Sequence, residues 1–252
     1  MPVREPSRPS VVVSCHVELP FDDAVWERFA SFQRSRPGGL RIAALLRPPA
    51  PEADEREEAW LDRVAVAGRQ GPLGHHTHFG GVYNARPPKP ELAAEHLRHE
   101  ANWIRERDVA PRFWCGGGWY MTPSIASVLA DFGYVDCTAT AFPLAYLPSG
   151  AAHLRIAEPH SLQLDDGRRL LELPVTHSLR MAVRLSASLR RMEERPVHIY
   201  FHDWELKDRR RAVALRAVLT TLGERCRRSD LDELADEVGR DVPELPLPCG
   251  EL

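Results

Sequence analysis

The sequence predicts an α/β fold in which parallel strands are enclosed by helices, with a barrel favoured over a doubly wound open sheet. Short apolar runs alternate with amphipathic, charge-rich stretches along the chain, which is the pattern of repeated strand–helix units. The length of 252 residues suits one α/β barrel. No GxGxxG motif follows a predicted strand, so nothing supports a dinucleotide-binding fold.

The first half of the chain shows this alternation most clearly. Val11–Cys15 is short and rich in β-branched residues, which predicts a buried strand. Between residues 22 and 34, Val25, Phe29 and Phe32 recur at helical spacing. Further strands are expected at 40–46, 72–76, 112–115 and 134–138, and further helices at 52–68, 90–107 and 123–132. Thr122 is the expected N-cap of the helix at 123–132, and Gly133 its end.

The middle of the chain differs, because an Asp166-Gly167 pair separates two runs of alternating polarity. This predicts an antiparallel hairpin excursion near 150–175. Beyond it we expect helices at 179–194, 208–225 and 231–238, a strand at 197–201, and Ser229 as the cap of the last helix. The domain division is a disordered leader over 1–10, one barrel domain over 11–240 and a proline-rich tail over 241–252.

The charge and hydropathy of the sequence limit the classes of partner that we expect. The net charge is -3, which predicts no nucleic-acid partner. No apolar run approaches the roughly 20 residues of a membrane span, and the polar start lacks the apolar core of an export signal. The five cysteines are scattered without CxxC spacing, which argues against a disulfide framework and favours a cytoplasmic location. Nothing in the sequence indicates the oligomeric state.

Polar residues of catalytic type cluster where predicted strands end. They are His16 and Glu18 after the first strand, His75, His76 and His78 at the third, Arg112 in the fourth, and His202, Asp203 and Glu205 at the late strand. The carboxyl ends of parallel strands and the loops after them form the active sites of such folds. We therefore expect these side chains to meet at one end of the sheet.

His76-Thr77-His78 is the sharpest local signal. Residues two apart in an extended segment point the same way, so both imidazoles can ligate one divalent metal. Glu18 or His16 as third ligand would leave an open position, as catalytic zinc sites require. Such a metal makes hydroxide available near neutral pH and polarises a carbonyl. The alternative is that this His-rich turn is merely a polar loop.

The remaining strand-end groups suggest acid and base roles. His16 and Glu18 share a face, so one can be a metal ligand and the other a general base; the alternative is a pair that hydrogen-bonds loop backbone. His202 can protonate a departing amine, oriented by Asp203 or Glu205, or it can be structural.

An aromatic, glycine-rich segment suggests a binding surface. Trp114, Trp119 and Tyr120 flank three glycines and can stack against the apolar side of a sugar, or they can be core aromatics around a tight turn. Arg112 and Trp204 are also expected to contact substrate. The thiols of Cys15 and Cys115 are expected to be small buried groups rather than nucleophiles.

The order of these motifs resembles that of the polysaccharide deacetylase family, the NodB-homology group of carbohydrate esterases. The resemblance extends over residues 11–238. It rests on the segments Ser14-Cys15-His16-Val17-Glu18, Gly74-His75-His76-Thr77, Arg112 to Tyr120, and Phe201-His202-Asp203-Trp204-Glu205-Leu206. It implies a distorted (β/α)7 barrel of the NodB-homology type that removes N- or O-acetyl groups from sugars with a divalent metal.

Three positions depart from the family pattern. His16 replaces the aspartate that usually acts as base, and Leu19 stands where one form of the first motif has its last acid. Gly80 occupies the place of the second histidine of the second motif, for which His78 is the substitute. These departures leave the fold implied and put the ligand set and the base in question.

The resulting hypothesis is a metal-dependent deacetylase of carbohydrate metabolism that hydrolyses an N-acylated sugar or sugar-containing metabolite. It assigns Glu18, His76 and His78 to one divalent metal, with zinc first and cobalt, manganese or nickel as alternatives, and His16, Glu18 and His202 to catalysis. The competing hypotheses are a catalytically inactive protein that binds a carbohydrate or metabolite on the same fold, and a different metal-dependent hydrolase or lyase.

Overall fold

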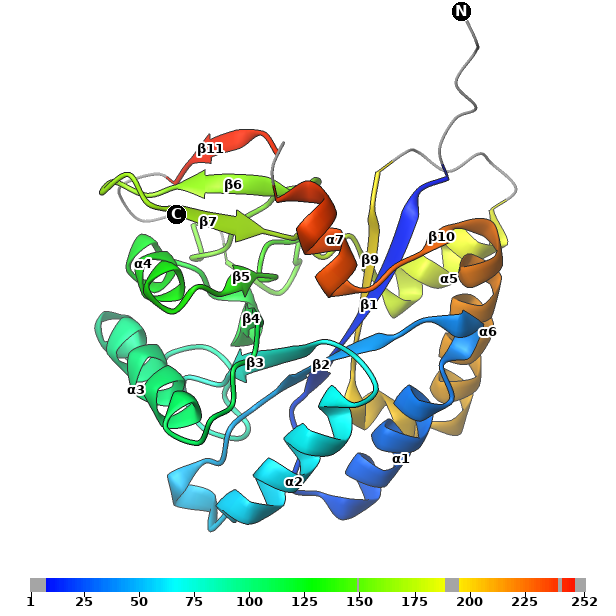
Figure 1. Ribbon diagram of the computed structural model, residues 1–252, viewed down its shortest axis with the longest axis horizontal. Helices are drawn as coiled ribbons and strands as arrows, with labels where there is room; N and C mark the ends of the chain where they lie inside the picture. Colours follow the sequence, from blue (N-terminus) through cyan, green and yellow to red (C-terminus); the bar gives the residue numbers. More distant parts are fainter. Residues whose placement is uncertain (1–7, 149, 189–194, 240–241, 248–252) are drawn as a thin grey trace, which may run out of the picture.

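A central sheet of mostly parallel strands organises the chain, as the computed structural model shows (Figure 1). The structure describes residues 8–148, 150–188, 195–239 and 242–247. The strands are β1 (Ser10–Val17), β2 (Ile42–Leu46), β3 (Leu73–Thr77), β4 (Phe113–Gly116), β5 (Val135–Asp136), β6 (His160–Gln163), β7 (Arg169–Glu172), β8 (His177–Ser178), β9 (Val197–His202), β10 (Arg227–Arg228) and β11 (Glu244–Pro246). The helices are α1 (Asp23–Arg34), α2 (Glu57–Gly68), α3 (Ala93–Arg105), α4 (Pro123–Phe132), α5 (Leu179–Ala187), α6 (Arg209–Arg225) and α7 (Leu231–Val238).

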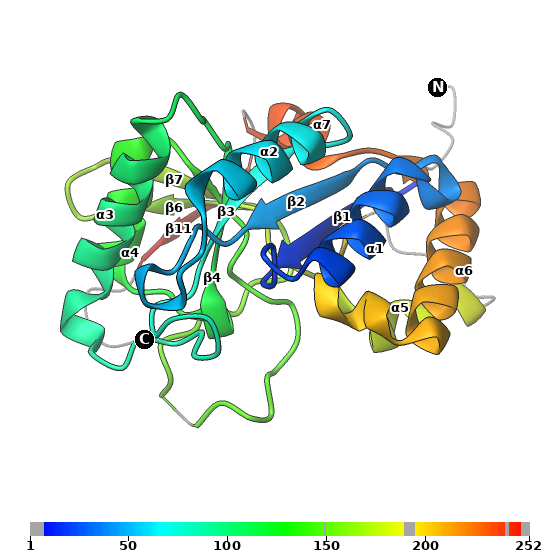
Figure 2. The same cartoon turned by 90° about the horizontal axis from the view of Figure 1, so that it is seen from below.

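The sheet runs in the order β11-β6-β7-β5-β4-β3-β2-β1-β9-β8, with β10 beside β1. Every described pair is parallel except β6 with β7. Helices lie on the outside: α3 and α4 flank one end of this series, and α5 and α6 the other (Figure 2). The α/β class with a central parallel sheet is thereby confirmed.

The sheet is barrel-like but does not close, which corrects the expected closed (β/α)7 ring. The hairpin β6–β7 and β11 extend the sheet outward beyond β5 instead of turning back to β8. The chain crosses the gap as a single segment: Leu173 N donates to Asp136 O on one side, and Thr176 N donates to His198 O on the other. No ladder joins β7 to β8 in the described residues.

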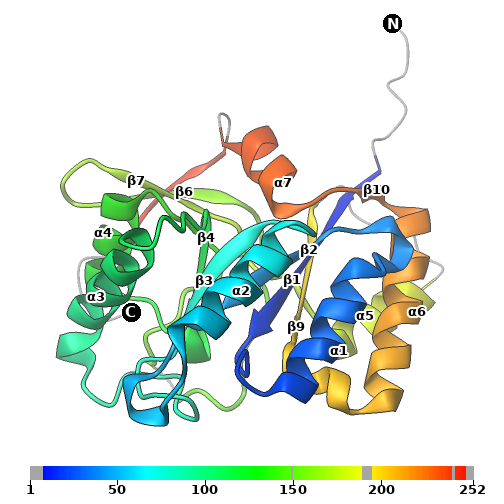
Figure 3. The ribbon, with the colours of Figure 1, turned by 60° about the horizontal axis from the view of Figure 1, so that its bottom comes forward.

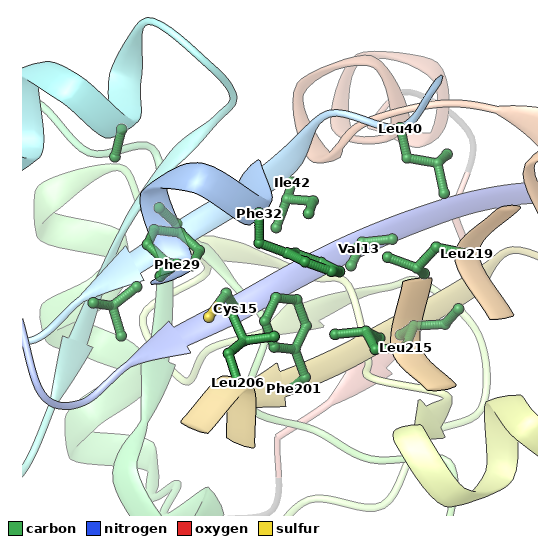
Figure 4. Packing of buried hydrophobic residues seen from close by; sticks show 14 of the residues in the cluster. Val13, Cys15, Phe29, Phe32, Leu40, Ile42, Phe201, Leu206, Leu215 and Leu219 are labelled. Atoms are coloured by element: carbon green, nitrogen blue, oxygen red, sulfur yellow. The ribbon is translucent and has the colours of Figure 1, made fainter. Parts of the chain in front are cut away.

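The side chains of β1 are divided between the two faces of the sheet. Its residues alternate in direction, and Val11, Val13 and Cys15 point outward into a core formed with α1 and α6. Figure 4 shows Cys15 beside Phe29 and Phe201 in this layer. The other residues of β1, among them Ser14 and His16, therefore face the interior of the sheet.

Helix α7 closes the amino-terminal end of the interior. Leu231, Leu234 and Ala235 are buried in one cluster with Val12 and Phe113 from the sheet, and Figure 3 shows α7 at the tail of the β1 arrow. The carboxyl ends of the strands open on the opposite side, where loops are free to form a site. Among the described residues, no helix combines the length and apolar character that crossing a bilayer requires.

Local signals set several element boundaries. Thr122 Oγ1 accepts from Ile125 N at the start of α4, and Gly133 ends that helix with φ 68°, as the sequence predicts. The predicted cap Ser229 is wrong by one residue, because Asp230 accepts from Glu233 N and caps α7. An aspartate at this place satisfies an unpaired helix N–H just as a serine would.

The predicted excursion appears as the antiparallel pair β6–β7, with Gly167 at φ 82° in its turn. Strand β11 then pairs with β6 within the segment expected as a tail. Most of the expected leader (residues 1–7), part of the expected helix at 179–194 (residues 189–194) and residues 248–252 lie outside the described residues.

Candidate metal centre and active site

Three imidazoles from the ends of two strands converge on one carboxylate oxygen of Glu18, which follows a third strand. Glu18 Oε1 lies 3.3 Å from His78 Nε2, 3.5 Å from His202 Nε2 and 3.7 Å from His76 Nε2. Glu18 follows β1, His76 is in β3, His78 follows it, and His202 ends β9. The structure thus brings together four of the residues that the strand-end pattern singles out, and leaves His75 and Arg112 outside the cluster.

Strand register explains this convergence. His16 of β1 pairs with His202 of β9, and side chains two residues apart share a face, so Glu18 continues on the side of His16. The same alternation places His76 and His78 on one face of β3, with their ring centroids 4.9 Å apart. Three parallel strands therefore deliver imidazoles and a carboxylate to one point above the interior.

The Glu18 carboxylate is held from the opposite side. Its Oε2 accepts a 2.8 Å hydrogen bond from Trp204 Nε1, which leaves Oε1 for the imidazoles. Asp203 accepts from the backbone N–H groups of Glu18 and Leu19, and Arg47 Nε donates to Glu18 O. These bonds fix the loop after β1 and with it the direction of the carboxylate.

The electrostatics of the cluster favour an ionised Glu18. Burial alone would raise the pKa of Glu18, but the nearby imidazoles of His76, His78 and His202 outweigh it and hold the pKa well below its usual range. For His76, burial lowers the pKa to about 4 despite the carboxylate. At neutral pH, Glu18 is therefore an anion and His76 a neutral ring.

The tautomers of two histidines are set by backbone carbonyls. His76 Nδ1 lies 2.9 Å from Cys115 O, and His78 Nδ1 lies 3.0 Å from Val82 O. A carbonyl oxygen only accepts, so each Nδ1 carries a proton. The neutral His76 ring therefore presents a bare Nε2, whereas His78 Nε2 lies at hydrogen-bond distance, 3.3 Å, from Glu18 Oε1. Hydrogen bonds of this kind orient the histidine ligands of metal sites.

The Nε2 atoms of His76 and His78 and the carboxylate of Glu18 fit a divalent cation. His76 Nε2 is buried and has no hydrogen-bond partner within the described residues, although it faces Glu18. One donor atom each from Glu18, His76 and His78 lies within 4.8 Å of the other two, and donors about 2.1 Å from a tetrahedral zinc lie roughly 3.4 Å apart. The lone pair of His76 Nε2 and the Glu18 anion repel one another unless a cation lies between them.

The side chain of Asn84 leaves little room for a histidine in place of Gly80. A Cβ at Gly80 would lie 2.6 Å from Asn84 Nδ2, so a larger side chain needs Asn84 to move. His78 supplies the second imidazole two residues earlier, and its ring is 4% exposed.

His16 lies beneath the cluster and is almost fully buried. Its ring stacks on His76 at a centroid distance of 4.7 Å and meets Trp119 at 5.3 Å. Burial, followed by the neighbouring His76 and His202, lowers the pKa of His16 well below its usual value. His16 Nε2 has no hydrogen-bond partner in the described part of the chain, so a neutral imidazole with an unused nitrogen lies next to the proposed ligand His76.

His202 stands on the other side of the carboxylate and is paired differently. It does not join the three mutually close donor atoms, and its Nδ1 lies 3.6 Å from Glu205 Oε2. Burial lowers the pKa of His202, but Glu205 and Glu18 outweigh burial and raise it above its ordinary value. Of the two residues expected to orient it, Glu205 contacts the ring, whereas Asp203 accepts from the backbone.

The aromatic residues of the expected binding surface are divided. Trp119 packs on His16 and Tyr200, and Trp204 stacks on His202 at 5.1 Å, so both border the cluster. Trp114 is fully buried on the outer side of β4, where its Nε1 donates to Thr77 Oγ1. Tyr120 packs on Phe79 in the same outer core.

Arg112 lies at the wrong end of its strand to reach the cluster. It precedes β4, and its guanidinium pairs with Asp232 and Asp236 of α7, the helix that closes the amino-terminal end. The structure therefore places these three side chains away from the cluster: Arg112 pairs with α7, and Trp114 and Tyr120 pack in the outer core.

The buried thiols are poorly suited to nucleophilic attack. Burial raises the pKa of Cys15 and of Cys115 well above its usual value, and nearby carboxylates raise it further. Cys15 faces the outer core. Cys115 lies within 4.8 Å of donor atoms of His16 and His76, but its thiol is protonated at neutral pH.

Sequence reasoning missed two interior residues of β9. Tyr200 packs on His16 at 5.3 Å and on Trp119 at 4.8 Å. His198 Nε2 lies 2.9 Å from Ser14 Oγ. The alternation that places His202 inside places Tyr200 and His198 there as well, so the signal was present in Val197-His198-Ile199-Tyr200-Phe201-His202.

Comparison with known proteins supports the fold. No protein-family model matches the chain, and no curated protein gives a significant match. The chain resembles the crystal structure of 4-alpha-glucanotransferase from Thermococcus litoralis with a TM-score of 0.59 at 13% identity, over 97% of this chain and 42% of that one. It therefore covers less than half of that enzyme, and the likeness concerns the fold alone.

Other solved structures are more distant. A family 4 carbohydrate esterase from Streptomyces lividans, in complex with acetate, gives a TM-score of 0.45 at 12% identity over 87% of this chain and 89% of that one. A tryptophan synthase from M. tuberculosis gives 0.40 at 9% identity over 88% and 94%. The named neighbours are enzymes of different activities, so an activity has to be argued from the site.

Proposed function

We propose that this protein is a metal-dependent hydrolase that removes an acetyl or other small acyl group from an N-acylated sugar or sugar-containing metabolite. The observation that carries the proposal is the pair of carbonyl-anchored histidines whose Nε2 atoms face Glu18 Oε1, with His76 Nε2 buried and unpartnered within the described residues. The motif order shared with polysaccharide deacetylases supports the reaction class. A cytoplasmic location is part of the proposal and fits Cys15, Cys115 and Cys137, which form no disulfide.

The chain offers three ligands for one divalent metal: Glu18, His76 and His78. Mixed carboxylate and imidazole donors suit zinc, and cobalt, manganese or nickel bind similar sets. When bound there, the metal supplies Lewis acidity toward the acyl carbonyl and lowers the pKa of water. Three protein ligands are the number found in catalytic zinc sites, which keep a further position for water or substrate.

His16 and His202 are placed to move protons on either side of the ligands. The Nε2 of His16 is unused by described residues, and in this proposal it accepts a proton from the attacking water. His202 has a raised pKa and a carboxylate partner in Glu205, so it can donate a proton to the departing nitrogen. Trp204 holds the Glu18 carboxylate in its direction throughout.

Metal content and acetate release test this proposal together. Elemental analysis of the purified chain, of His76→Ala and of His78→Ala is expected to give one divalent metal in the parent and none in the variants. His99→Ala, which removes an exposed imidazole of α3, is the control that retains the metal. Only the chains that retain the metal should release acetate from N-acetylated sugars.

The other outcomes separate the competing functions. A chain that binds no zinc, cobalt, manganese or nickel, yet binds sugars, is a binding protein on this fold. Metal binding with turnover of some other bond, and no release of acid from any N-acyl compound, contradicts the deacetylase assignment and favours a different hydrolase or lyase.

A further inference from the structure

A second cluster of metal-binding side chains lies on the interior side of the candidate metal centre. One ring nitrogen each of His16 and His76 and the sulfur of Cys115 lie within 4.8 Å of one another. These three residues form what we call the lower cluster. It shares His76 with the proposed divalent-metal ligands but contains neither Glu18 nor His78, so it offers a cation a different set of donor atoms.

Strand positions, and not a loop, bring the lower cluster together. His76 of β3 and Cys115 of β4 are paired in the parallel register of these strands, so their side chains leave the same face of the sheet. His16 comes from β1, and its ring stacks on the ring of His76 at a centroid distance of 4.7 Å and an interplanar angle of 27°. Sites held by strands are more precisely fixed than sites held by loops.

Two buried nitrogen atoms of the lower cluster have no protein partner. His16 and His76 are each 2% exposed, and the Nε2 of each ring makes no hydrogen bond within the described residues. His76 Nδ1 donates to Cys115 O, so the lone pair that this ring offers is on Nε2. A buried polar atom without a partner costs free energy unless a ligand engages it. Two such atoms beside one thiol therefore point to a bound cation.

The donor atoms of the lower cluster favour a soft cation. Thiolate sulfur selects copper(I) in particular, and imidazole also binds copper. The thiol of Cys115 is the only acidic group of the three, so its thiolate and a monovalent cation together carry no net charge, which suits a buried place. The thiol donates only a long hydrogen bond of 3.8 Å, to Gly116 O. Donors about 2.0–2.3 Å from a metal lie roughly 3.5 Å apart, which is compatible with the observed limit.

A cation can reach the lower cluster from the carboxyl end of the sheet. Glu18 Oε1 lies 3.7 Å from His76 Nε2, and the side chains of Glu18 and His202 are each 21% exposed. An anion at the entrance attracts cations from solvent. The partly exposed carboxylate therefore leads a cation to the nitrogen that both ligand sets share.

We propose that His16, His76 and Cys115 form a second metal site, which binds copper(I) and competes with the divalent metal for His76. On binding, the S–H bond of Cys115 breaks, a sulfur–copper bond forms and the proton leaves to solvent, while copper remains monovalent. One lone pair on Nε2 cannot bind two metals, so copper(I) removes a ligand from the divalent metal. It also occupies the His16 nitrogen that serves as the base, so copper(I) inhibits the enzyme. This inhibition rests on the hydrolase function proposed above.

Competition with a copper(I) chelator measures the second site without turnover. The full chain, with copper kept reduced by ascorbate, is expected to take one copper(I) from bathocuproine disulfonate. Cys115→Ala and His16→Ala should each bind copper(I) more weakly by about a hundredfold or more, because even partners that only orient a ligand contribute about tenfold to a hundredfold. Cys115→Ser, which is closer in volume to the thiol, should behave as Cys115→Ala does.

The matched control removes an equally buried thiol from the other face of the sheet. Cys15 is 0% exposed, as Cys115 is, and it packs in the outer core. Cys15→Ala should therefore bind copper(I) as the parent does. Copper K-edge spectra should show a sulfur neighbour in the parent and in Cys15→Ala, but none in Cys115→Ala.

Zinc release separates this proposal from the hydrolase assignment. About one equivalent of copper(I) should release zinc from the zinc-loaded parent to a colorimetric indicator, whereas Cys115→Ala should retain its zinc. Copper(I) binding of equal strength in Cys115→Ala and the parent overturns the second site, and so does zinc that is already lost from untreated Cys115→Ala. A chain that binds copper(I) through Cys115 but neither binds zinc nor releases acetate supports the second site and contradicts the hydrolase.

Discussion

Two buried carboxylate sites in this protein behave in opposite ways. Glu18 faces three imidazoles and an indole N–H, which hold its pKa well below the usual range. Asp136 and Glu172 are paired across β5 and β7 and are fully buried. Burial raises the pKa of both, and the charge of Asp136 raises that of Glu172 further. Burial raises the pKa at both sites, although Glu18 is only partly buried, so the neighbouring groups decide whether such a carboxyl group ionises or keeps its proton.

The largest expected effect separates the two sites by the same substitution. Glu18→Gln removes the anionic ligand, so it should release the metal and lower activity by about 10³-fold, since the metal contributes several kcal/mol to the transition state. Glu172→Gln should keep both the metal and the activity. Metal content and acetate release on the two variants are the measurements. A Glu18→Gln variant that retains its metal would show that Glu18 is not a ligand.

The role of His202 sharpens the account of the Glu18 site. His202→Asn should retain the metal and lose about 10²–10³-fold of its activity on an N-acetyl sugar, because an amine leaves only with a proton. Hydrolysis of 4-nitrophenyl acetate should fall much less, since its leaving group needs no proton. Rates on the two substrates, with metal content measured in parallel, decide the matter. Loss of the metal would instead make His202 a ligand.

A smaller effect is expected from the group behind the carboxylate. Trp204→Phe removes the 2.8 Å hydrogen bond to Glu18 Oε2 while keeping an aromatic ring against His202. Partners that orient a ligand affect metal affinity by about tenfold or more, so titration with a chelator should show weaker binding of that order. Trp103→Phe, which changes an indole of α3 that packs on Trp60 of α2, is the control. Equal affinity in both variants would mean that the indole does not orient Glu18.

The ligand cluster was predictable because it depends on local geometry. Residues two apart on a strand share a face, and parallel strands end at one edge, so His76, His78, Glu18 and His202 follow from short segments alone. Arg112 is the first residue of the predicted strand and precedes β4 in the structure, so the direction of the strand already places it at the amino-terminal end, away from the cluster. Trp114 failed because its neighbour Cys115 faces inward, and the same alternation points Trp114 outward.

Features that depend on distant pairing were not predictable. Asp136 and Glu172 are far apart in sequence and meet only because β5 pairs with β7. The open sheet has the same origin, since nothing local indicates that β6, β7 and β11 extend outward from β5. The cavity beside His78 depends on two separate loops and on α3. Pairing partners and loop paths are tertiary properties that one sequence leaves open.

The stability of the paired carboxyl groups provides the last test of the comparison. Because folding raises the pKa of Glu172, the protonated group stabilises the fold fully below the pKa of an unfolded glutamate, about 4.3. This stability is lost as the pH rises through the pKa of the folded protein. Glu172→Gln cannot ionise, so relative to the parent it should become more stable at high pH, by about 2 kcal/mol.

Thermal melting of the parent and of Glu172→Gln between about pH 5 and about pH 9 measures this difference. Glu58→Gln, which removes the same charge from the exposed face of α2, should follow the parent. Parallel curves for all three proteins would mean that ionisation of the Asp136–Glu172 pair at high pH does not lower the stability of the fold. In that case the neighbours of a buried carboxyl group would not account for the contrast with Glu18, and only the imidazoles would set that site apart.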